Sequence, residues 1–384
     1  MKEEEEGCKR KVEGGWLKEE GGRSVAAEAD LRHVKRAPFL MIAAVLVACH
    51  LRKSTVHAPT PYVFDLPEWA AADTALRMDF PYDNPITVEG VELGRALFHE
   101  KALSANGTLS CASCHQQAHA FAEPRIVSAG VDGSSGRRNA QPLINLAWDH
   151  FFFWDARALS LELQAFEPVR GHREMGGDWQ QVIARLGKDR RYPALFRAAF
   201  GDERIDSMRI AFALAQFERT LVSLGSRYDR FAYEGDRTAL TREELRGKEL
   251  FFTRAHCVDC HEPPLFEHHE VSNIGLDSAF VDGGMGERTG IPWHVGRFKT
   301  PTLRNIAVTD PYMHDGRFAT LEEVVDFYAD DVHTSSPTLD PHMQPWVKGE
   351  VGLRAQDRAD LVAFLHALTD SAFLVEPRFG PPMR

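Results

Sequence analysis

The stretch Cys111-Ala112-Ser113-Cys114-His115 decides the fold of this chain. Two thiols three positions apart, followed at once by an imidazole, form the attachment motif of a c-type haem. In such a motif the thiols bond covalently to the porphyrin and the histidine ligates the iron. A second copy, Cys-Val-Asp-Cys-His, occupies residues 257–261. We therefore predict two covalently bound haem c groups, attached through Cys111, Cys114, Cys257 and Cys260 and ligated by His115 and His261.

A zinc site is the alternative interpretation of paired CxxC motifs, because two such pairs can form one tetrahedral site. The two pairs here are 143 positions apart (257 − 114), and each is followed directly by histidine. Each pair also lies in its own copy of a repeated segment. A shared metal would join the two copies, so the sequence favours haem.

The repeat has a constant offset of 160 positions. Residues 143–147 (Leu-Ile-Asn-Leu-Ala) align with residues 303–307 (Leu-Arg-Asn-Ile-Ala), since 303 − 143 is 160, and the alignment continues without a gap to Glu162 and Glu322. This register sets Trp154 opposite His314. An internal duplication of this length indicates homologous domains, not a solenoid. We predict two c-type cytochrome domains, residues 60–235 and residues 236–384.

Apolar residues recur with helical period. One amphipathic helix is predicted from spacings of four and three along Ile210, Leu214, Phe217, Leu221 and Leu224. Another should begin after Asp178 and stop at Gly187. Residues 61–85, rich in Pro, Asp and Asn, favour an irregular strap over the domain surface. The expected fold is mainly α, with few short strands.

Length and composition limit the classes of function. A chain of 384 residues with 43% hydrophobic content is long enough for two packed domains. Its net charge is −11, and no cluster of Lys and Arg appears in the part expected to fold. Since phosphate binding depends on such clusters, we expect no nucleic-acid partner.

An export signal is predicted near the N-terminus. Residues 37–48 form an apolar run behind basic residues, too short to span a bilayer but typical of a signal peptide over residues 37–49. The run ends in Leu-Val-Ala before Cys49, which resembles a lipoprotein cleavage site; ordinary secretory cleavage is the alternative. We expect residues 1–36 either to form a disordered tail or to lie upstream of the true start of the protein. The expected location is the periplasm, with a lipid anchor if Cys49 is lipidated.

The second iron has one candidate for its other axial ligand. Thr320 and Glu323 form a capping box, and the helix that they open carries Tyr328 on its apolar face. One interpretation is an ordinary core aromatic. The other is a phenolate bound to iron, a hard anionic ligand that stabilises high oxidation states.

The first iron has no such candidate. In residues 116–138 only His119 could ligate, and it lies too near the attachment motif to reach the opposite face, so a surface or propionate contact suits it better. An open ferric haem binds peroxide. Gln164 and Glu174 are the candidates for its far side, where a carboxylate could serve as acid and base in O–O cleavage. An exposed loop glutamate is the alternative for Glu174.

Together these residues resemble the bacterial di-haem cytochrome c peroxidase and MauG superfamily, from about Asn84 to Thr369. The matching segments are Leu-Gly-Arg-Ala-Leu-Phe at 93–98, both haem motifs, Arg138-Asn139, Phe153-Trp154-Asp155, Gln164, Glu174-Met175 and residues 309–317.

The resemblance implies roles for several residues. Glu174 would be the catalytic glutamate, Gln164 its neighbour in the distal pocket, and Trp154 the tryptophan between the haems, which relays oxidising equivalents. Trp154 could equally be a large core aromatic. The resemblance further implies a calcium ion between the haems at Asn139, Thr309 and Pro311, the last two binding through backbone carbonyls.

Two departures separate branches of the superfamily. Peroxidases that need reductive activation carry a histidine on the first iron where this chain has Val131, and they usually carry methionine on the second iron where this chain has Tyr328, as MauG does. Residues 226–231 also look like those of methanobactin-associated di-haem enzymes, which oxidise tryptophan on a small partner.

These features favour a peroxidase-type oxidoreductase that cleaves H2O2 at the first haem and passes electrons through the second. Two sources of electrons stay open: a small cytochrome c or similar donor protein, or a Trp or Tyr side chain on a partner protein, as for MauG. A non-catalytic electron carrier with both irons saturated is the third hypothesis.

Overall fold

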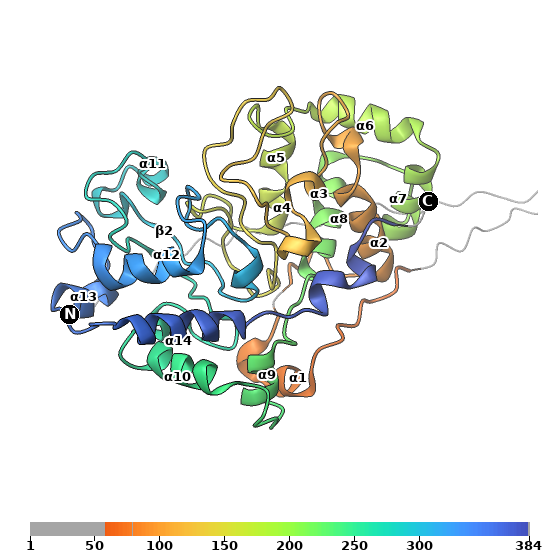
Figure 1. Ribbon diagram of the computed structural model, residues 1–384. Helices are drawn as coiled ribbons and strands as arrows, with labels where there is room; N and C mark the ends of the chain where they lie inside the picture. Colours follow the sequence, from red (N-terminus) through yellow and green to blue (C-terminus); the bar gives the residue numbers. More distant parts are fainter. Residues whose placement is uncertain (1–57, 79, 383–384) are drawn as a thin grey trace, which may run out of the picture. The chain divides into compact units, whose positions relative to one another are not determined.

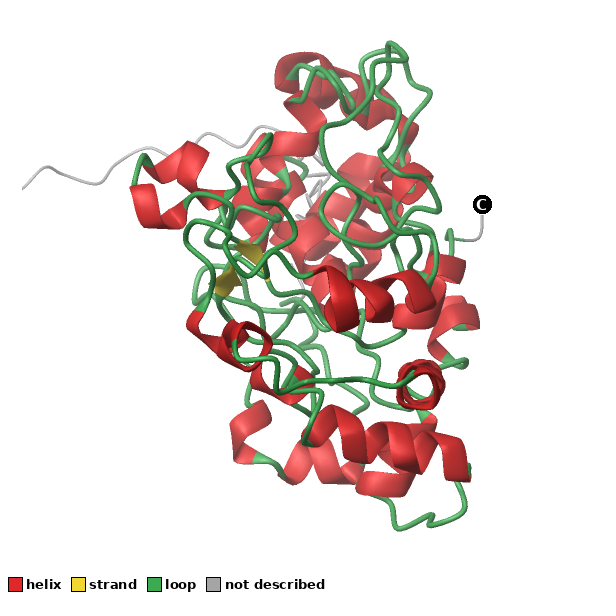
Figure 2. Cartoon of the chain, turned by 60° about the vertical axis from the view of Figure 1, so that its left-hand side comes forward, coloured by secondary structure: helices red, strands yellow, loops and turns green. Residues whose placement is uncertain are grey.

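The computed structural model describes residues 58–78 and 80–382 and is mainly α-helical (Figures 1 and 2). Within these residues the only sheet is the antiparallel pair β1 (Val271–Ser272) and β2 (Phe298–Lys299), so the predicted fold class is confirmed. None of the described helices is long and apolar enough to cross a membrane. The predicted signal peptide and Cys49 lie outside the described residues.

The helices fall into two groups along the chain. The first group comprises α1 (Glu68–Ala72), α2 (Val88–Phe98), α3 (Cys111–Cys114), α4 (Leu161–Gln164), α5 (Phe166–Arg170), α6 (Trp179–Lys188), α7 (Arg191–Phe200), α8 (Ser207–Arg219) and α9 (Arg227–Ala232). The second comprises α10 (Arg242–Phe252), α11 (Met285–Thr289), α12 (Leu321–Asp326), α13 (Gln344–Val347) and α14 (Ala355–His366).

Each group is built on one closely packed helix pair, α2 with α8 and α10 with α14 (Figure 1). A Cβ atom on Gly94 of α2 would lie 1.9 Å from the carbonyl oxygen of Ala213. A Cβ atom on Gly247 of α10 would lie 1.8 Å from the carbonyl oxygen of Asp360. Both crossings therefore require glycine, and the two haem domains share one packing scheme.

The duplication extends to backbone detail. The antiparallel bridge Phe152–Ala158 has its counterpart 160 residues later in Tyr312–Phe318. Asn145 and Asn305, also 160 apart, both have left-handed φ angles, of 59° and 57°. The side chain of Asn145 exchanges hydrogen bonds with the backbone of Ser223, and that of Asn305 donates to the Ser223 hydroxyl at 2.8 Å. The predicted internal duplication is confirmed.

Two apolar cores follow the two groups of helices. There are two exceptions: Tyr228 of α9 belongs to the second core, and Phe373 and Phe379 of the C-terminal tail belong to the first. Arg95 of α2 holds this tail through a 2.6 Å hydrogen bond to the carbonyl oxygen of Gly380. The domain boundary between residues 235 and 236 stays a prediction.

Two predicted helix ends were wrong. Helix α6 begins after Asp178 as expected, but it continues through Gly187 to Lys188 and is capped by Asp189. Gly187 is solvent-exposed and keeps a helical conformation, which glycine tolerates at a modest cost. Helix α8 ends at Arg219, so Leu221 and Leu224 are buried in the extended segment that follows. The predicted strap contains the short helix α1.

Candidate haem centres and peroxide site

The first cavity lies over α3 and is lined by both its cysteines and His115. The Nδ1 atom of His115 donates a hydrogen bond to the carbonyl oxygen of Phe121 at 2.7 Å. Phe121, whose carbonyl oxygen accepts this bond, has a left-handed backbone with a φ of 59°. The bond fixes the tautomer, because Nδ1 carries the proton and Nε2 keeps its lone pair for a metal.

The second cavity repeats this arrangement around Cys257, Cys260 and His261. Nδ1 of His261 lies 3.2 Å from the carbonyl oxygen of Phe266, whose φ is 54°. Burial lowers the pKa of His261 to about 4, so its imidazole is neutral near pH 7, as a metal ligand must be.

The thiols also fit covalent haem attachment. All four described cysteines are free of disulfides, and each lines one of the two cavities beside its histidine. Burial raises the pKa of Cys114 to about 11, so this thiol is neutral and enclosed. Each cavity therefore offers the two sulfur atoms and the one imidazole that a haem c requires.

Glu174 brings a carboxyl group into the first cavity. It follows α5 in a turn closed by its N–H, which donates to the carbonyl oxygen of Gly171 at 3.0 Å. Its Oε2 atom is buried and has no hydrogen-bond partner among residues 58–78 and 80–382. Burial raises the pKa of Glu174, while the nearby charge of Arg157 lowers it. A carboxyl group in this setting can accept and return a proton within the cavity.

Gln164 lines the same cavity from the last position of α4. The hydroxyl of Ser160 caps this helix by accepting from the N–H of Leu163 at 3.2 Å. The structure thus brings Gln164, Glu174 and His115 together around one space, although they are distant in sequence. Their catalytic roles stay predictions.

Val131, which the resemblance places where related peroxidases carry a histidine ligand, lies next to Glu174. Its N–H donates to the carbonyl oxygen of Glu174 at 2.7 Å, and its side chain is not among those lining the first cavity. His119 points elsewhere, since its Nδ1 lies 3.1 Å from the carbonyl oxygen of Val308 in the other half of the chain. Neither residue contributes an axial ligand to the first cavity.

Tyr328 lines the second cavity together with Cys257 and Cys260. It lies in the π-helical turn η7 (Phe327–Asp331) that continues α12, and the predicted capping box of Thr320 with Glu323 is confirmed. Burial, and then the two thiols, raise the pKa of its phenol well above the usual range. The indole N–H of Trp346 fixes the turn by donating to the carbonyl oxygen of Tyr328 at 2.6 Å. Ligation by Tyr328 stays a prediction.

Trp154 lines both cavities. Its indole N–H donates to the carbonyl oxygen of Asn139 at 2.9 Å, and its own carbonyl oxygen accepts from the N–H of Lys299 at 2.7 Å. Its ring centroid lies 6.5 Å from that of His314, the residue set opposite to it by the repeat. Trp154 therefore lies between the two cavities, where a residue that relays oxidising equivalents between the haems is expected.

The three residues predicted to bind calcium all line one cavity. Asn139, Thr309 and Pro311 all line the second cavity, although 170 positions (309 − 139) separate the first two. The amide nitrogen of Asn139 donates to the carbonyl oxygen of Arg125 at 2.9 Å. The calcium ion itself stays a prediction.

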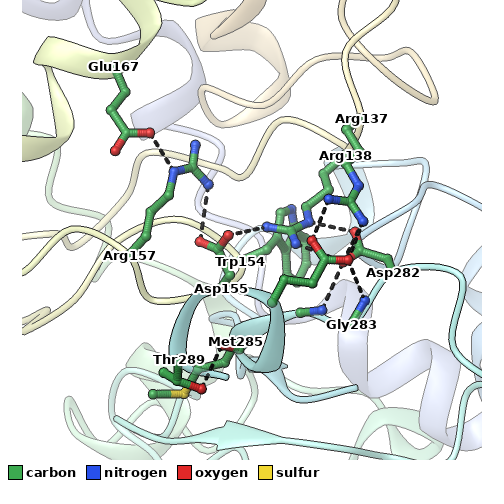
Figure 3. A network of polar contacts seen from close by, with 12 residues as sticks. Arg137, Arg138, Trp154, Asp155, Arg157, Glu167, Asp282, Gly283, Met285 and Thr289 are labelled. Atoms are coloured by element: carbon green, nitrogen blue, oxygen red, sulfur yellow. Dashed lines mark hydrogen bonds and ion pairs between the residues drawn. The ribbon is translucent and has the colours of Figure 1, made fainter. Parts of the chain in front are cut away.

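A chain of ion pairs around Trp154, which sequence reasoning missed, crosses from one half to the other (Figure 3). Asp155 accepts from Arg157 at 3.1 Å and from Arg138 at 2.7 Å. Arg138 also donates to both carboxylate oxygens of Asp282, at 2.7 and 2.8 Å. Arg138 lies in a segment that matched the superfamily and Arg157 lies in the internal repeat, but Asp282 lies in a loop with no recognisable pattern.

Lys299 is a second residue that sequence reasoning missed. It is buried, lines both cavities, and contacts Asp149 at 3.1 Å and Glu267 at 3.5 Å. The 160-residue offset pairs it with Asn139, which also lines both cavities.

Comparison with known proteins identifies the family. A family model described as "Di-haem cytochrome c peroxidase" matches residues 88–238. The methylamine utilization protein MauG of Methylorubrum extorquens is 39% identical over 291 residues, which are 75% of this chain and 80% of MauG. This chain belongs to the di-haem cytochrome c peroxidase and MauG family. The predicted superfamily is confirmed.

Other members of the family are similar over comparable lengths. The cytochrome c551 peroxidase of Nitrosomonas europaea is 35% identical over 253 residues, 63% of this chain and 73% of the peroxidase. The crystal structure of a MauG-like protein associated with microbial copper homeostasis superposes with a TM-score of 0.75 at 35% identity, covering 84% of this chain and all of that one.

The cofactors and the class of reaction follow from the family to which the chain belongs. It is a di-haem, peroxide-dependent oxidoreductase of the cytochrome c peroxidase type, with two haem c groups. H2O2 is its oxidising substrate, and its electrons come from a donor or partner protein.

Proposed function

We propose that H2O2 is cleaved in the first cavity, without prior reduction of the protein, by acid–base catalysis from Glu174. The observation that carries the proposal is the unpartnered Oε2 atom of Glu174, buried in the cavity that also holds His115. The second support is Val131, because valine cannot ligate iron and stands where the resemblance places the histidine ligand of peroxidases that need reductive activation.

The haem supplies the iron that takes up the two oxidising equivalents of peroxide. Glu174, whose pKa burial raises, accepts the proton of one peroxide oxygen and delivers it to the oxygen that leaves as water. The amide of Gln164, with one acceptor and two donor hydrogens, orients the peroxide beside Glu174. Cleavage to two water molecules takes up two electrons and two protons.

Cys257, Cys260, His261 and Tyr328 would hold the second haem, which would supply an electron-transfer centre, and Trp154 lies between the two cavities. The location of Trp154 against both cavities supports its role as a relay. A calcium ion at Asn139, Thr309 and Pro311 would hold the two domains at the same place. Export to the periplasm accompanies this function because haem c is attached outside the cytoplasm; lipidation of Cys49 would add an anchor.

A second candidate function is oxidation of a Trp or Tyr side chain on a partner protein. Tyr328 in the second cavity favours it, as does the similarity to MauG and to the MauG-like protein of copper homeostasis. Plain peroxide removal with electrons from a small cytochrome c is the broader function, and the two share the chemistry in the first cavity.

Spectroscopy of the oxidised holoprotein tests the proposal. We expect one high-spin ferric haem, and we expect H2O2 to change its spectrum without added reductant. Incubation with peroxide and candidate donors, including the products of adjacent genes, would then separate donor oxidation from modification of a partner. Two low-spin haems that do not react with peroxide would contradict the proposal and favour an electron carrier.

A further inference from the structure

A second buried carboxyl group, that of Glu218, lines the first cavity. Glu218 belongs to α8, and its side chain lies one helical turn after that of Leu214, which lines the same cavity. The residue is 4% exposed, and its Oε2 atom has no hydrogen-bond partner within the described part of the chain. Glu218 is thus a polar group that faces the haem-binding space and that the acid–base chemistry of Glu174 does not use.

Arg219, the cation whose charge acts on Glu218, is already paired with another carboxylate. It donates to both oxygens of Glu162, at 2.6 and 3.1 Å, so Glu218 is left without a counterion. A buried carboxylate without a counterion is costly and takes up a proton. Burial raises the pKa of Glu218 to about 8, and the charge of Glu162 on α4 also raises it. The carboxyl group of Glu218 is therefore protonated near pH 7.

In the described chain, the neighbouring helices α2 and α3 bring no counterion to Glu218. The charged side chains of α2 are exposed or bonded elsewhere: Glu92 is exposed, Glu89 accepts from the N–H of Thr60, and Arg95 donates to the carbonyl oxygen of Gly380. On α3 the thiol of Cys111 acts on Glu218, and its sulfur carries no charge once it is bonded to the porphyrin. The charge of Glu218 therefore depends on the ion pair between α4 and α8 and on the iron held in the cavity.

The second domain shows which residue the fold accepts at the position of Glu218. A Cβ atom on Gly94 would lie 2.8 Å from the Cβ atom of Phe217 on α8. A Cβ atom on Gly247 would lie 2.9 Å from the Cβ atom of Phe364 on α14. The two helix crossings therefore relate α8 to α14 by an offset of 147 positions (364 − 217).

This offset pairs Glu218 with Leu365, and Leu214 with Leu361. All four side chains line the cavity of their own domain. Leucine therefore fills this position beside the second haem centre, and the packing of the helix pair does not require a carboxyl group. The proton of Glu218 belongs to the first centre and has no counterpart at this position in the second.

We propose that Glu218 holds a proton that it releases when the first haem centre is oxidised by peroxide and regains from solvent when that centre is reduced. The inference rests on the proposed function, because peroxide is the oxidant of this centre. A positive charge added in the cavity favours the carboxylate, and removal of that charge favours the carboxyl group. Glu218 thus keeps the total charge of the first centre nearly constant, which Leu365 cannot do in the second.

The proton balance of peroxide cleavage requires such a group. Converting one H2O2 into two water molecules consumes two electrons and two protons. Glu174 moves a proton from one peroxide oxygen to the other and ends in the form in which it began, so it supplies no net proton. Glu218 supplies one proton as its O–H bond breaks and its carboxylate forms, and solvent supplies the other. The donor protein supplies the electrons, and Glu218 is then protonated again by solvent.

The test uses the full-length holoprotein, reduced and oxidised electrochemically without peroxide. One readout is the infrared difference spectrum, in which a carboxyl group that changes its protonation gives a C=O band. The other is the midpoint potential of each haem as a function of pH. Glu218→Gln and Glu218→Leu both remove the proton, and the second domain already accepts leucine at Leu365. Glu174→Gln is the matched control, because it removes the other unpartnered carboxyl group of the same cavity.

In wild type, the potential of the first haem should fall as the pH rises around 8, because reduction of this haem takes up the proton of Glu218. Both Glu218 variants should lose this slope and the carboxyl band, with no change at the second haem. Glu174→Gln should keep the slope and the band of Glu218. Glu162→Gln removes a charge that raises the pKa of Glu218, so the slope should persist at lower pH. If Glu218→Gln folds poorly, Glu218→Leu and Glu162→Gln still decide the question.

Two results would overturn the inference while the proposed function stands: a slope in the Glu218 variants equal to that of wild type, or a wild-type infrared spectrum without a carboxyl band. The proposed function is judged separately, by the reaction of the wild-type protein with H2O2. If the wild-type protein does not react with H2O2, the proposed function falls, and the supply of a proton from Glu218 to peroxide falls with it.

Discussion

Tyr328 and Pro168 occupy equivalent positions in the two halves of the chain, 160 residues apart (328 − 168). Each follows a short helix that begins at the same place in the repeat, α4 after Ser160 and α12 after Thr320. Each lines the cavity of its own half. The duplicated fold therefore presents a phenol to the second cavity where it presents proline, which cannot ligate iron, to the first.

Tyr328→Phe should change the spectrum of one haem only. Loss of the phenolate would alter the absorption of the second haem and raise its reduction potential, because an anionic ligand stabilises the oxidised metal. Tyr312→Phe is the matched control, since Tyr312 lines the same cavity but donates its hydroxyl to the carbonyl oxygen of Ile306 at 2.9 Å. Identical spectra for the two variants would show that Tyr328 is only a core aromatic.

Glu174→Gln should slow peroxide cleavage by roughly 10²- to 10⁴-fold, the usual contribution of a general acid–base group. The amide fills the same volume but cannot carry the proton. Stopped-flow mixing of the oxidised holoprotein with H2O2 measures the rate, with the exposed Glu234→Gln as control. A rate equal to that of the control would remove Glu174 from the mechanism.

Arg157→Gln should move the acidic limb of the pH profile for peroxide cleavage to higher pH. Glu174 must be ionised to accept a proton, and Arg157 lowers its pKa against the effect of burial. Without that charge the pKa of Glu174 rises, so activity is lost sooner as the pH falls.

Glu167→Gln should move the acidic limb of the same pH profile in the opposite direction. Glu167 raises the pKa of Glu174 and pairs with Arg157 at 2.5 Å. Its removal lowers the pKa of Glu174, so the limb should move to lower pH. Shifts in the same direction for both variants would mean that a different group titrates.

The parts of the structure that could be predicted were those that leave a motif or a repeat in the sequence. The two haem motifs and the capping box at Thr320 each depend on residues near one another in sequence, and the 160-residue repeat can be found by aligning two similar stretches of the chain. The partner of Arg138 could not be found in this way, because Asp282 lies 144 positions away in an irregular loop. Nor could the contact of Trp69 with Tyr233, which depends on how the strap crosses the surface.

The two glycine crossings provide a prediction about stability. Gly94→Ala and Gly247→Ala would each force a Cβ atom to within 2 Å of a backbone oxygen on the partner helix, so each should lower the free energy of unfolding by about 1–3 kcal/mol or more. Gly187→Ala is the control, because a Cβ atom there meets nothing within 4 Å in the described chain and removes the flexibility of a helical glycine. It should raise stability by about 0.5–1 kcal/mol. Chemical denaturation of the holoproteins measures all three, and a loss at Gly94 without one at Gly247 would show that the two helix pairs are not energetically equivalent, despite their shared geometry.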